Sequence, residues 1–116
     1  MLVEDDDEVA ALVADMLREL GYFVTRVAGA QAALGALADN RPVDLVFSDV
    51  MMPGFMNGVD LAREIRRRRP NVAIVLTTGY AGAALQHADV DNVNLLFKPY
   101  EISTLDTALR RALRQT

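Results

Sequence analysis

The sequence predicts a doubly wound α/β fold, in which helices cover both faces of a five-stranded parallel sheet. Three observations support this prediction. The chain has 116 residues, 52% of them hydrophobic, which suits a single domain with a packed core. Short apolar stretches alternate five times along the chain with segments that have mostly helical spacing. Nearly continuous apolar strands are typical of parallel sheets buried on both faces. We therefore expect one (βα)5 domain over residues 1–116, with right-handed crossovers.

The first half of the chain predicts three strands and two helices. Leu2 and Val3 end a short buried strand. An apolar helical face follows and stops at Gly21; its members are Val9, Leu12, Val13, Met16, Leu17 and Leu20. The aromatic and β-branched run 22–27 predicts a second strand. A second helix at 30–37 ends before Asn40 and Pro42, and the apolar run 43–48 predicts a third strand.

The second half of the chain predicts two more strands, two clear helices and one segment with only a weak helical pattern. Asn57 suits the N-cap of a helix that contains Leu61 and Ile65 and ends before Pro70. Residues 72–76 and 93–97 predict the fourth and fifth strands. The segment 79–91, rich in glycine and alanine, predicts at most one short helix. The last helix has an apolar face made of Ile102, Leu105, Leu109, Ala112 and Leu113.

Composition excludes several classes of function. The net charge is −4, and acids concentrate at residues 4–8, which argues against direct nucleic-acid binding. The longest apolar run has six residues, whereas a membrane-spanning helix needs roughly 20, so we expect no membrane contact. The absence of cysteine and the single histidine, His87, exclude disulfides, thiolate zinc sites and a His-rich metal centre. No signal-peptide pattern is present, and we expect a cytoplasmic location.

Polar side chains stand where four of the expected strands end. Glu4 and Asp5 follow the first strand, Asp49 follows the third, Thr78 the fourth and Lys98 the fifth. The carboxyl ends of parallel strands share one edge of the sheet, where ligands bind. Three carboxylates brought together repel unless a cation intervenes, and Mg²⁺ prefers such oxygen ligands. With a lysine and a hydroxyl nearby, the set indicates phosphoryl transfer to a carboxylate nucleophile.

Each of these residues also has an ordinary structural explanation. Asp49 alone suits a turn, Thr78 a strand and Lys98 the surface, so only their joint placement indicates a site. The acids at 6–8 are interpreted as charges at a helix N-terminus.

The whole chain resembles the receiver domain of two-component response regulators, whose fold is flavodoxin-like, or CheY-like. Five short motifs carry the resemblance and occur in the family's order. They are Val3-Glu4-Asp5-Asp6, Ser48-Asp49-Val50-Met51-Met52-Pro53-Gly54, Asn57-Gly58, Leu76-Thr77-Thr78-Gly79 and Phe97-Lys98-Pro99. The resemblance implies that a sensor histidine kinase or a histidine phosphotransfer domain is the partner.

The resemblance also implies roles for the acids. Asp49 is the expected phosphorylation site and takes its phosphoryl group from a histidine. Asp5 and Asp49 are expected to bind Mg²⁺ directly, with Mn²⁺ as a substitute. Glu4 is expected to act through water, and Met51 to offer its backbone carbonyl. We expect self-phosphorylation and slow self-dephosphorylation rather than conventional enzyme turnover.

Switching is expected to start from the other site residues. Thr78 and Lys98 are expected to contact the phosphoryl oxygens, with Gly79 in support and Pro99 as a cis proline that directs Lys98. The change would alter the face formed by the segment 79–91, the strand 93–97 and the last helix, a face through which receivers often dimerise. Leu95 stands where the family often has an inward-swinging aromatic residue. Tyr80 could take over that part.

The origin of the chain is a separate expectation. Few residues precede Val3, and no output domain follows the last helix, so we expect a segment of a longer protein. The loop after Asp49 is one residue longer than usual, and together with the run 78–80 it resembles receivers at the end of hybrid histidine kinases. A stand-alone regulator is the alternative.

Three other functions were weighed. A haloacid dehalogenase phosphatase needs an acid two residues after its nucleophile, where this chain has Met51. A flavodoxin-type electron carrier needs a phosphate-binding loop after the first strand, where the acids at 4–8 would repel phosphate. A docking module that works without phosphorylation stays open, and phosphate incorporation distinguishes it.

Overall fold

The computed structural model describes residues 1–39, 41–52, 54, 56–79 and 93–114. The five strands of this part form one parallel sheet, as predicted, and their order in the sheet is β2-β1-β3-β4-β5. The strands are β1 (Leu2–Val3), β2 (Arg26–Val27), β3 (Leu45–Asp49), β4 (Ala73–Thr78) and β5 (Val93–Phe97). The helices are α1 (Asp7–Glu19), α2 (Ala30–Ala38), α3 (Gly58–Arg68) and α5 (Ile102–Arg114). The short helix expected within 79–91 falls, except for Gly79, outside the described residues.

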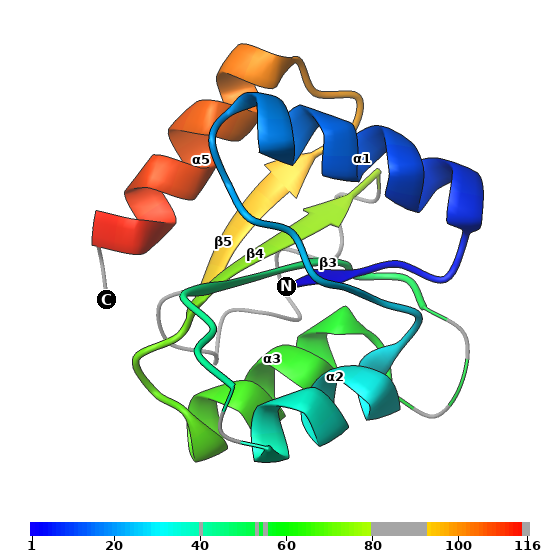
Figure 1. The fold of residues 1–116 in the computed structure, drawn as a ribbon, viewed down its shortest axis with the longest axis vertical. Coiled ribbons are helices and arrows are strands. Elements are labelled where there is room, and N and C mark those ends of the chain that lie inside the picture. The colour runs from blue at the N-terminus through cyan, green and yellow to red at the C-terminus, as the bar shows by residue number, and fades with distance from the viewer. Residues whose placement is uncertain (40, 53, 55, 80–92, 115–116) are drawn as a thin grey trace.

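Helices cover both faces of the sheet, so the core has two halves (Figure 1). Helices α1 and α5 lie on one face and α2 and α3 on the other. Neighbouring residues of a strand point to opposite faces, and Leu2 accordingly packs with the α1–α5 half while Val3 packs with the α2–α3 half. Within the described part of the chain, no helix combines the length and apolar character needed to cross a membrane.

The predicted strand at 22–27 is wrong over most of its length, because only Arg26 and Val27 join the sheet. Its single neighbour, β1, pairs Leu2 with Arg26, so no β1 residue stands opposite residues 22–24. Residues 22–24 therefore have no partner strand for ladder hydrogen bonds, whatever their β propensity. Phe23 is fully exposed. The third strand begins at Leu45 rather than at 43, opposite the first residue of β4, Ala73.

The predicted end of α1 before Gly21 and the predicted N-cap of α3 at Asn57 are confirmed, and Asp6, interpreted only as a charge at a helix N-terminus, caps α1. Asp6 is the N-cap of α1, where its carboxylate accepts hydrogen bonds from the backbone N–H groups of Glu8 (2.9 Å) and Val9 (3.1 Å). Gly21 follows this helix with a φ of +100°, which glycine adopts without strain. Asn57 caps α3 in a reciprocal capping box with Asp60. These caps fix the loops that follow β1 and β3.

Candidate functional site

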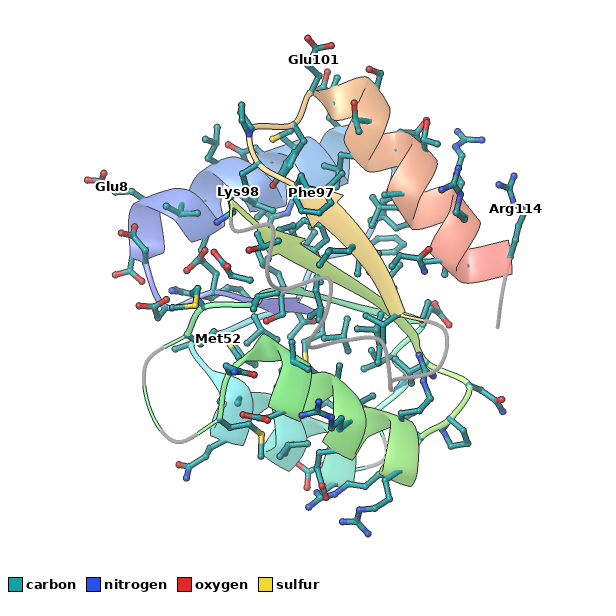
Figure 2. The ribbon with its side chains drawn as sticks, turned by 180° about the vertical axis from the view of Figure 1, so that it is seen from behind. Glu8, Met52, Phe97, Lys98, Glu101 and Arg114 are labelled. Carbon is teal, nitrogen blue, oxygen red and sulfur yellow. The ribbon has the colours of Figure 1, made fainter. Side chains whose placement is uncertain are left out.

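The site is built at the carboxyl ends of four neighbouring strands. The strand order changes direction between β1 and β3, and a crevice at such a switch point is where ligands bind in open parallel sheets. Asp49, the last residue of β3, stands opposite Thr77, and Thr78 stands opposite Phe97, which directly precedes Lys98. In Figure 2, Lys98, Met52 and Glu8 lie toward the same side of the molecule, away from Arg114. The predicted site residues therefore share one edge of the sheet.

Asp49 is held by two donors from different parts of the chain. Its Oδ1 accepts a hydrogen bond from the backbone N–H of Met51 at 3.0 Å, and its Oδ2 forms an ion pair with Nζ of Lys98. The Asp49 side chain is 18% exposed and that of Lys98 is 42% exposed, so the pair stays open to solvent on the lysine side. Both carboxylate oxygens are engaged, and Lys98 supplies a positive charge directly beside Asp49.

The hydroxyl-bearing residues near Asp49 are buried. Thr78 is 1% exposed and Ser48 0%. The Ser48 hydroxyl donates to the backbone carbonyl of Asp49 at 2.9 Å, which fixes the main chain behind the carboxylate. The backbone N–H of Lys98 donates to the carbonyl of Thr78 at 2.8 Å, and the Lys98–Pro99 peptide bond is cis, the conformation that the resemblance implies. The ends of β4 and β5 are thereby joined at the site.

Glu4 and Asp5 supply the acidic side of the site. Burial raises the pKa of Glu4, and the neighbouring charges of Asp5 and Asp49 raise it further, while the backbone N–H of Asp6 opposes the rise. That N–H donates to Glu4 Oε2 at 3.2 Å. Glu4 therefore lies close enough to Asp5 and to Asp49 for the charges of both to act on it.

The residues present fit a hard divalent cation by their chemistry. Carboxylate oxygens and a backbone carbonyl are the donors that Mg²⁺ prefers, and the mutual repulsion at Glu4 is what such an ion would relieve. Among the described residues, no three His, Cys, Asp or Glu side chains are already arranged to hold a metal. The present contacts explain this, because Glu4 turns toward the Asp6 N–H and Asp49 toward Lys98.

Gly58, which the sequence analysis named only as part of the motif Asn57-Gly58 and gave no role, packs against the site. A Cβ atom at this position would lie 2.3 Å from the carbonyl oxygen of Asp49 and 2.9 Å from Cα of Val50. The Gly58 N–H also donates to the Val50 carbonyl at 2.8 Å. The start of α3 therefore packs directly against the main chain of Asp49. A glycine right after the N-cap Asn57 was the available signal, since glycine is a poor helix former.

Arg26 is a second residue that the sequence did not single out. Its Nε donates to the carbonyl of Glu4 and its Nη1 to Oδ1 of Asp7, both at 2.8 Å. It therefore joins β2 to the loop that carries the acids. Arg26 is the only base among residues 19–40. A single positive charge on the strand expected beside the first one, which the acids at 4–8 follow, was the available signal.

The remaining predicted residues lie around this centre. The Met51 side chain points outward and is 70% exposed, while Gly79 directly follows β4. Leu95 is half-buried in the middle of β5, opposite Leu76. Tyr80 falls outside the described residues, as do residues 53 and 55 of the longer loop.

Replacing Glu4 with glutamine is expected to stabilise the metal-free protein at pH 7 by less than about 1 kcal/mol, because water screens a partly exposed charge. The raised pKa means that the folded state binds more protons than the unfolded state at pH values just above 4.5, the ordinary pKa of a glutamate side chain. Stability is thus lost as pH rises through this window. Urea unfolding in EDTA at pH 7 and pH 3.5 measures the effect, which should vanish at pH 3.5. Equal stability of both proteins at pH 7 would contradict it.

Comparisons with known proteins agree with this geometry. A family model described as the response regulator receiver domain matches residues 1–110. The chain is 30% identical over 116 residues to the response regulator receiver protein CpdR of Brucella abortus, covering 97% of this chain and 94% of that protein. It is 34% identical over 119 residues to the sensor kinase CckA of the same organism, covering 99% of this chain and 12% of that protein. Like CckA, several relatives are much longer than this chain: it spans 25% of the nitrogen assimilation regulatory protein NtrX of Azorhizobium caulinodans.

Solved structures show the same fold. The Vibrio cholerae chemotaxis protein CheY4 superposes with a TM-score of 0.84 at 28% identity, over 97% of this chain and 95% of that one. The receiver domain of NtrX from Brucella abortus gives a TM-score of 0.82 at 26% identity, over 99% and 98%. The predicted flavodoxin-like fold is confirmed. With a family model that matches nearly the whole chain, this chain belongs to the response regulator receiver domains of two-component signalling.

Proposed function

We propose that this domain accepts a phosphoryl group on Asp49 from a phosphohistidine of a partner protein. Receiver domains of this family generally bind Mg²⁺ for phosphorylation and interact with histidine kinases or phosphotransfer partners. The observation that carries the proposal is the ion pair of Asp49 with Lys98 at the end of β3, near buried Thr78 and the acids that follow β1. This ion pair supports the proposal because a cation next to the Asp49 carboxylate is what an incoming phosphoryl group would need.

The transfer exchanges one bond at phosphorus for another. A carboxylate oxygen of Asp49 attacks in line, the new O–P bond forms, and the P–N bond to the donor histidine breaks. The imidazole leaves with its electron pair and takes a proton. The Lys98 ammonium group then leaves Asp49 and contacts an oxygen of the phosphoryl group. There its positive charge stabilises the negative charge that develops during transfer. Thr78 offers its hydroxyl to another oxygen.

Four oxygen donors would hold Mg²⁺ in this site, and Mn²⁺ in its place. They are the carboxylates of Asp5 and Asp49, the backbone carbonyl of Met51 and, through water, Glu4. When bound, the ion supplies charge neutralisation for the transferring group. Pro99 and Gly79 hold the backbone around Lys98 and Thr78 in position.

The phosphorylated state is proposed to act through the β4–β5 side of the domain. The new dianion contacts Thr78 and Lys98, which stand at the ends of these strands and on the path to α5. Leu95 and Tyr80 are the candidates for coupling, and this face is also the proposed homodimer surface. We propose a cytoplasmic location and no direct nucleic-acid contact. The likeness to the sensor kinase CckA supports an origin in a hybrid kinase.

Phosphate uptake from acetyl phosphate tests the proposal. We expect Mg²⁺-dependent addition of one phosphoryl group, seen by intact mass, that EDTA abolishes and that Asp49→Asn removes completely. Asp44→Asn is the matched control, because this residue lies at the opposite end of β3 and should leave labelling unchanged. A folded wild-type protein that takes up no phosphate would favour the docking module instead.

A further inference from the structure

Arg26 fastens the two ends of the loop that carries the acids. Its Nε donates to the backbone carbonyl of Glu4 and its Nη1 donates to Oδ1 of Asp7, both at 2.8 Å. Asp5 lies between these two anchors, together with Asp6, the N-cap of α1. A guanidinium group is planar and its N–H groups point in fixed directions, so the two hydrogen bonds fix the anchors relative to each other. One side chain thereby holds the main chain on both sides of Asp5.

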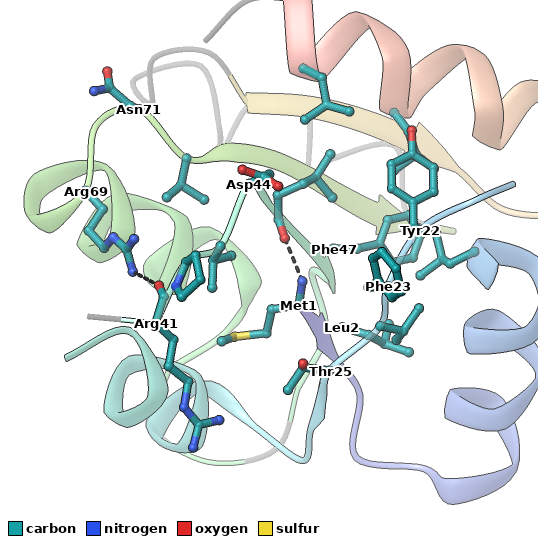
Figure 3. Close-up of a pocket in the computed structure, with 18 of the residues that line it drawn as sticks. Met1, Leu2, Tyr22, Phe23, Thr25, Arg41, Asp44, Phe47, Arg69 and Asn71 are labelled. Atoms are coloured by element: carbon teal, nitrogen blue, oxygen red, sulfur yellow. Dashed lines mark hydrogen bonds between the residues drawn. The ribbon is translucent and has the colours of Figure 1, made fainter. Parts of the chain in front are cut away.

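The strand that carries Arg26 is a firm base for this contact. The carbonyl of Thr25 accepts a hydrogen bond from the N–H of Leu2 at 2.8 Å, and Thr25 lies beside Leu2 in Figure 3. The carbonyl of Val27 accepts one from the N–H of Glu4 at 3.0 Å. Both chain neighbours of Arg26 are therefore bonded to β1 or to the residue that follows it. The position from which the guanidinium group reaches the loop is fixed by the sheet.

Arg26 would have two opposite effects on a cation bound by Asp5. Its positive charge repels the ion, but the Asp7 charge and water reduce this repulsion, because the Arg26 side chain is 31% exposed and that of Asp7 is 90% exposed. Its two hydrogen bonds favour the ion, since a ligand whose main chain is already held loses less conformational freedom on binding. Because the repulsion is screened, we expect the second effect to be the larger one.

We propose that Arg26 is a positioning residue for cation binding, which holds the loop 4–7 in the conformation in which Asp5 meets the ion. The inference rests on the proposed magnesium site and assigns no contact between Arg26 and the ion itself. It requires that the two hydrogen bonds of the guanidinium group matter more than its charge. Lysine at this position would keep the charge, but its single ammonium group cannot reproduce the fixed fork of two donors.

Calorimetric Mg²⁺ titration of Arg26→Lys and Arg26→Gln tests this role. We expect both variants to bind the ion about tenfold more weakly than wild type, as is usual when an outer partner of a metal site is lost. Arg18→Gln is the matched control, because it removes the same charge from an exposed ion pair with Asp15 on α1 and should leave the affinity unchanged.

The Mg²⁺ dependence of phosphate uptake from acetyl phosphate is the second measurement. Both Arg26 variants should need more Mg²⁺ to reach half of the maximal rate, and both should reach the wild-type rate at saturating Mg²⁺. A merely structural role of Arg26 would lower the saturated rate as well, and this result would contradict the proposal. Urea unfolding at the titration temperature verifies that each variant is folded.

A role of the charge alone gives a different pattern in the titration. Mg²⁺ would then bind more tightly to Arg26→Gln and equally well to Arg26→Lys, which would overturn the proposal. Equal affinities of wild type and both variants would also overturn it, while phosphate uptake by the wild-type protein would leave the proposed function standing. A wild-type protein that binds no Mg²⁺ would remove the magnesium site, and the role of Arg26 with it.

Discussion

Replacing Gly58 with alanine is expected to destabilise the domain by about 1–3 kcal/mol and to slow phosphorylation of Asp49 beyond what the lost stability explains. The added Cβ would lie 2.3 Å from the Asp49 carbonyl oxygen and 3.0 Å from its carbonyl carbon. Both atoms belong to the main chain, so no side-chain rotation relieves the contact. Either α3 or the end of β3 must move, and the second change displaces the phosphoacceptor itself.

Gly35→Ala is the matched control for this substitution. Gly35 lies inside α2, and a Cβ there would have no heavy atom within 4 Å. Alanine should therefore stabilise the domain by about 0.5–1 kcal/mol through helix propensity, with unchanged phosphorylation. Urea unfolding and acetyl phosphate labelling, at a temperature where both variants are folded, give the two measurements. A Gly58→Ala protein as stable as wild type would contradict the close packing.

Replacing Lys98 with methionine is expected to have opposite effects on ion binding and on phosphoryl transfer. Lys98 neutralises Asp49 in the absence of a ligand, so its removal frees Oδ2 and leaves the acids without a cation. Mg²⁺ should then bind several-fold more tightly. Phosphorylation at saturating Mg²⁺ should nevertheless slow by about 10²-fold, because no cation meets the charge that develops on the phosphoryl group.

Calorimetric Mg²⁺ titration and phosphorylation rates separate the two effects. Arg110→Met is the control, since it removes an exposed ion pair with Asp106 on α5, away from the strand ends, and should change neither quantity. Weaker Mg²⁺ binding in Lys98→Met would show that the lysine supports the ion rather than competes with it. An unchanged rate would remove Lys98 from the transfer step.

Most of the fold could be predicted because its strongest signals are local. The buried strands β3 and β4 and the half-buried β5 appear as mostly apolar runs, and the caps at Asp6 and Asn57 are chosen by one or two neighbouring residues. The prediction of a strand over 22–27 was wrong because a strand also depends on contacts with residues distant in the sequence. The strand propensity of the run is real, but a strand needs a partner, and the length of β1 decides how much of the run finds one.

The site was predictable where residue type and strand end coincide, as at Asp49 and Lys98. The role of Gly58 was not, because a glycine after the N-cap signals something unusual at this place, but only the approach of α3 to the end of β3 shows what it is. Arg26 also depends on tertiary structure, since it reaches from an edge strand to the carbonyl of Glu4. The metal ligands remain a prediction, because the carboxylates are turned toward other donors.

β4 is buried at all six positions and has a neighbouring strand on each side. Local opening should therefore start at the edge strands of the sheet and leave β4 in place. Thr78 is carried by the part of the domain that opens last, together with global unfolding. The hydroxyl that is proposed to meet the phosphoryl group should therefore keep its position through every smaller opening of the domain.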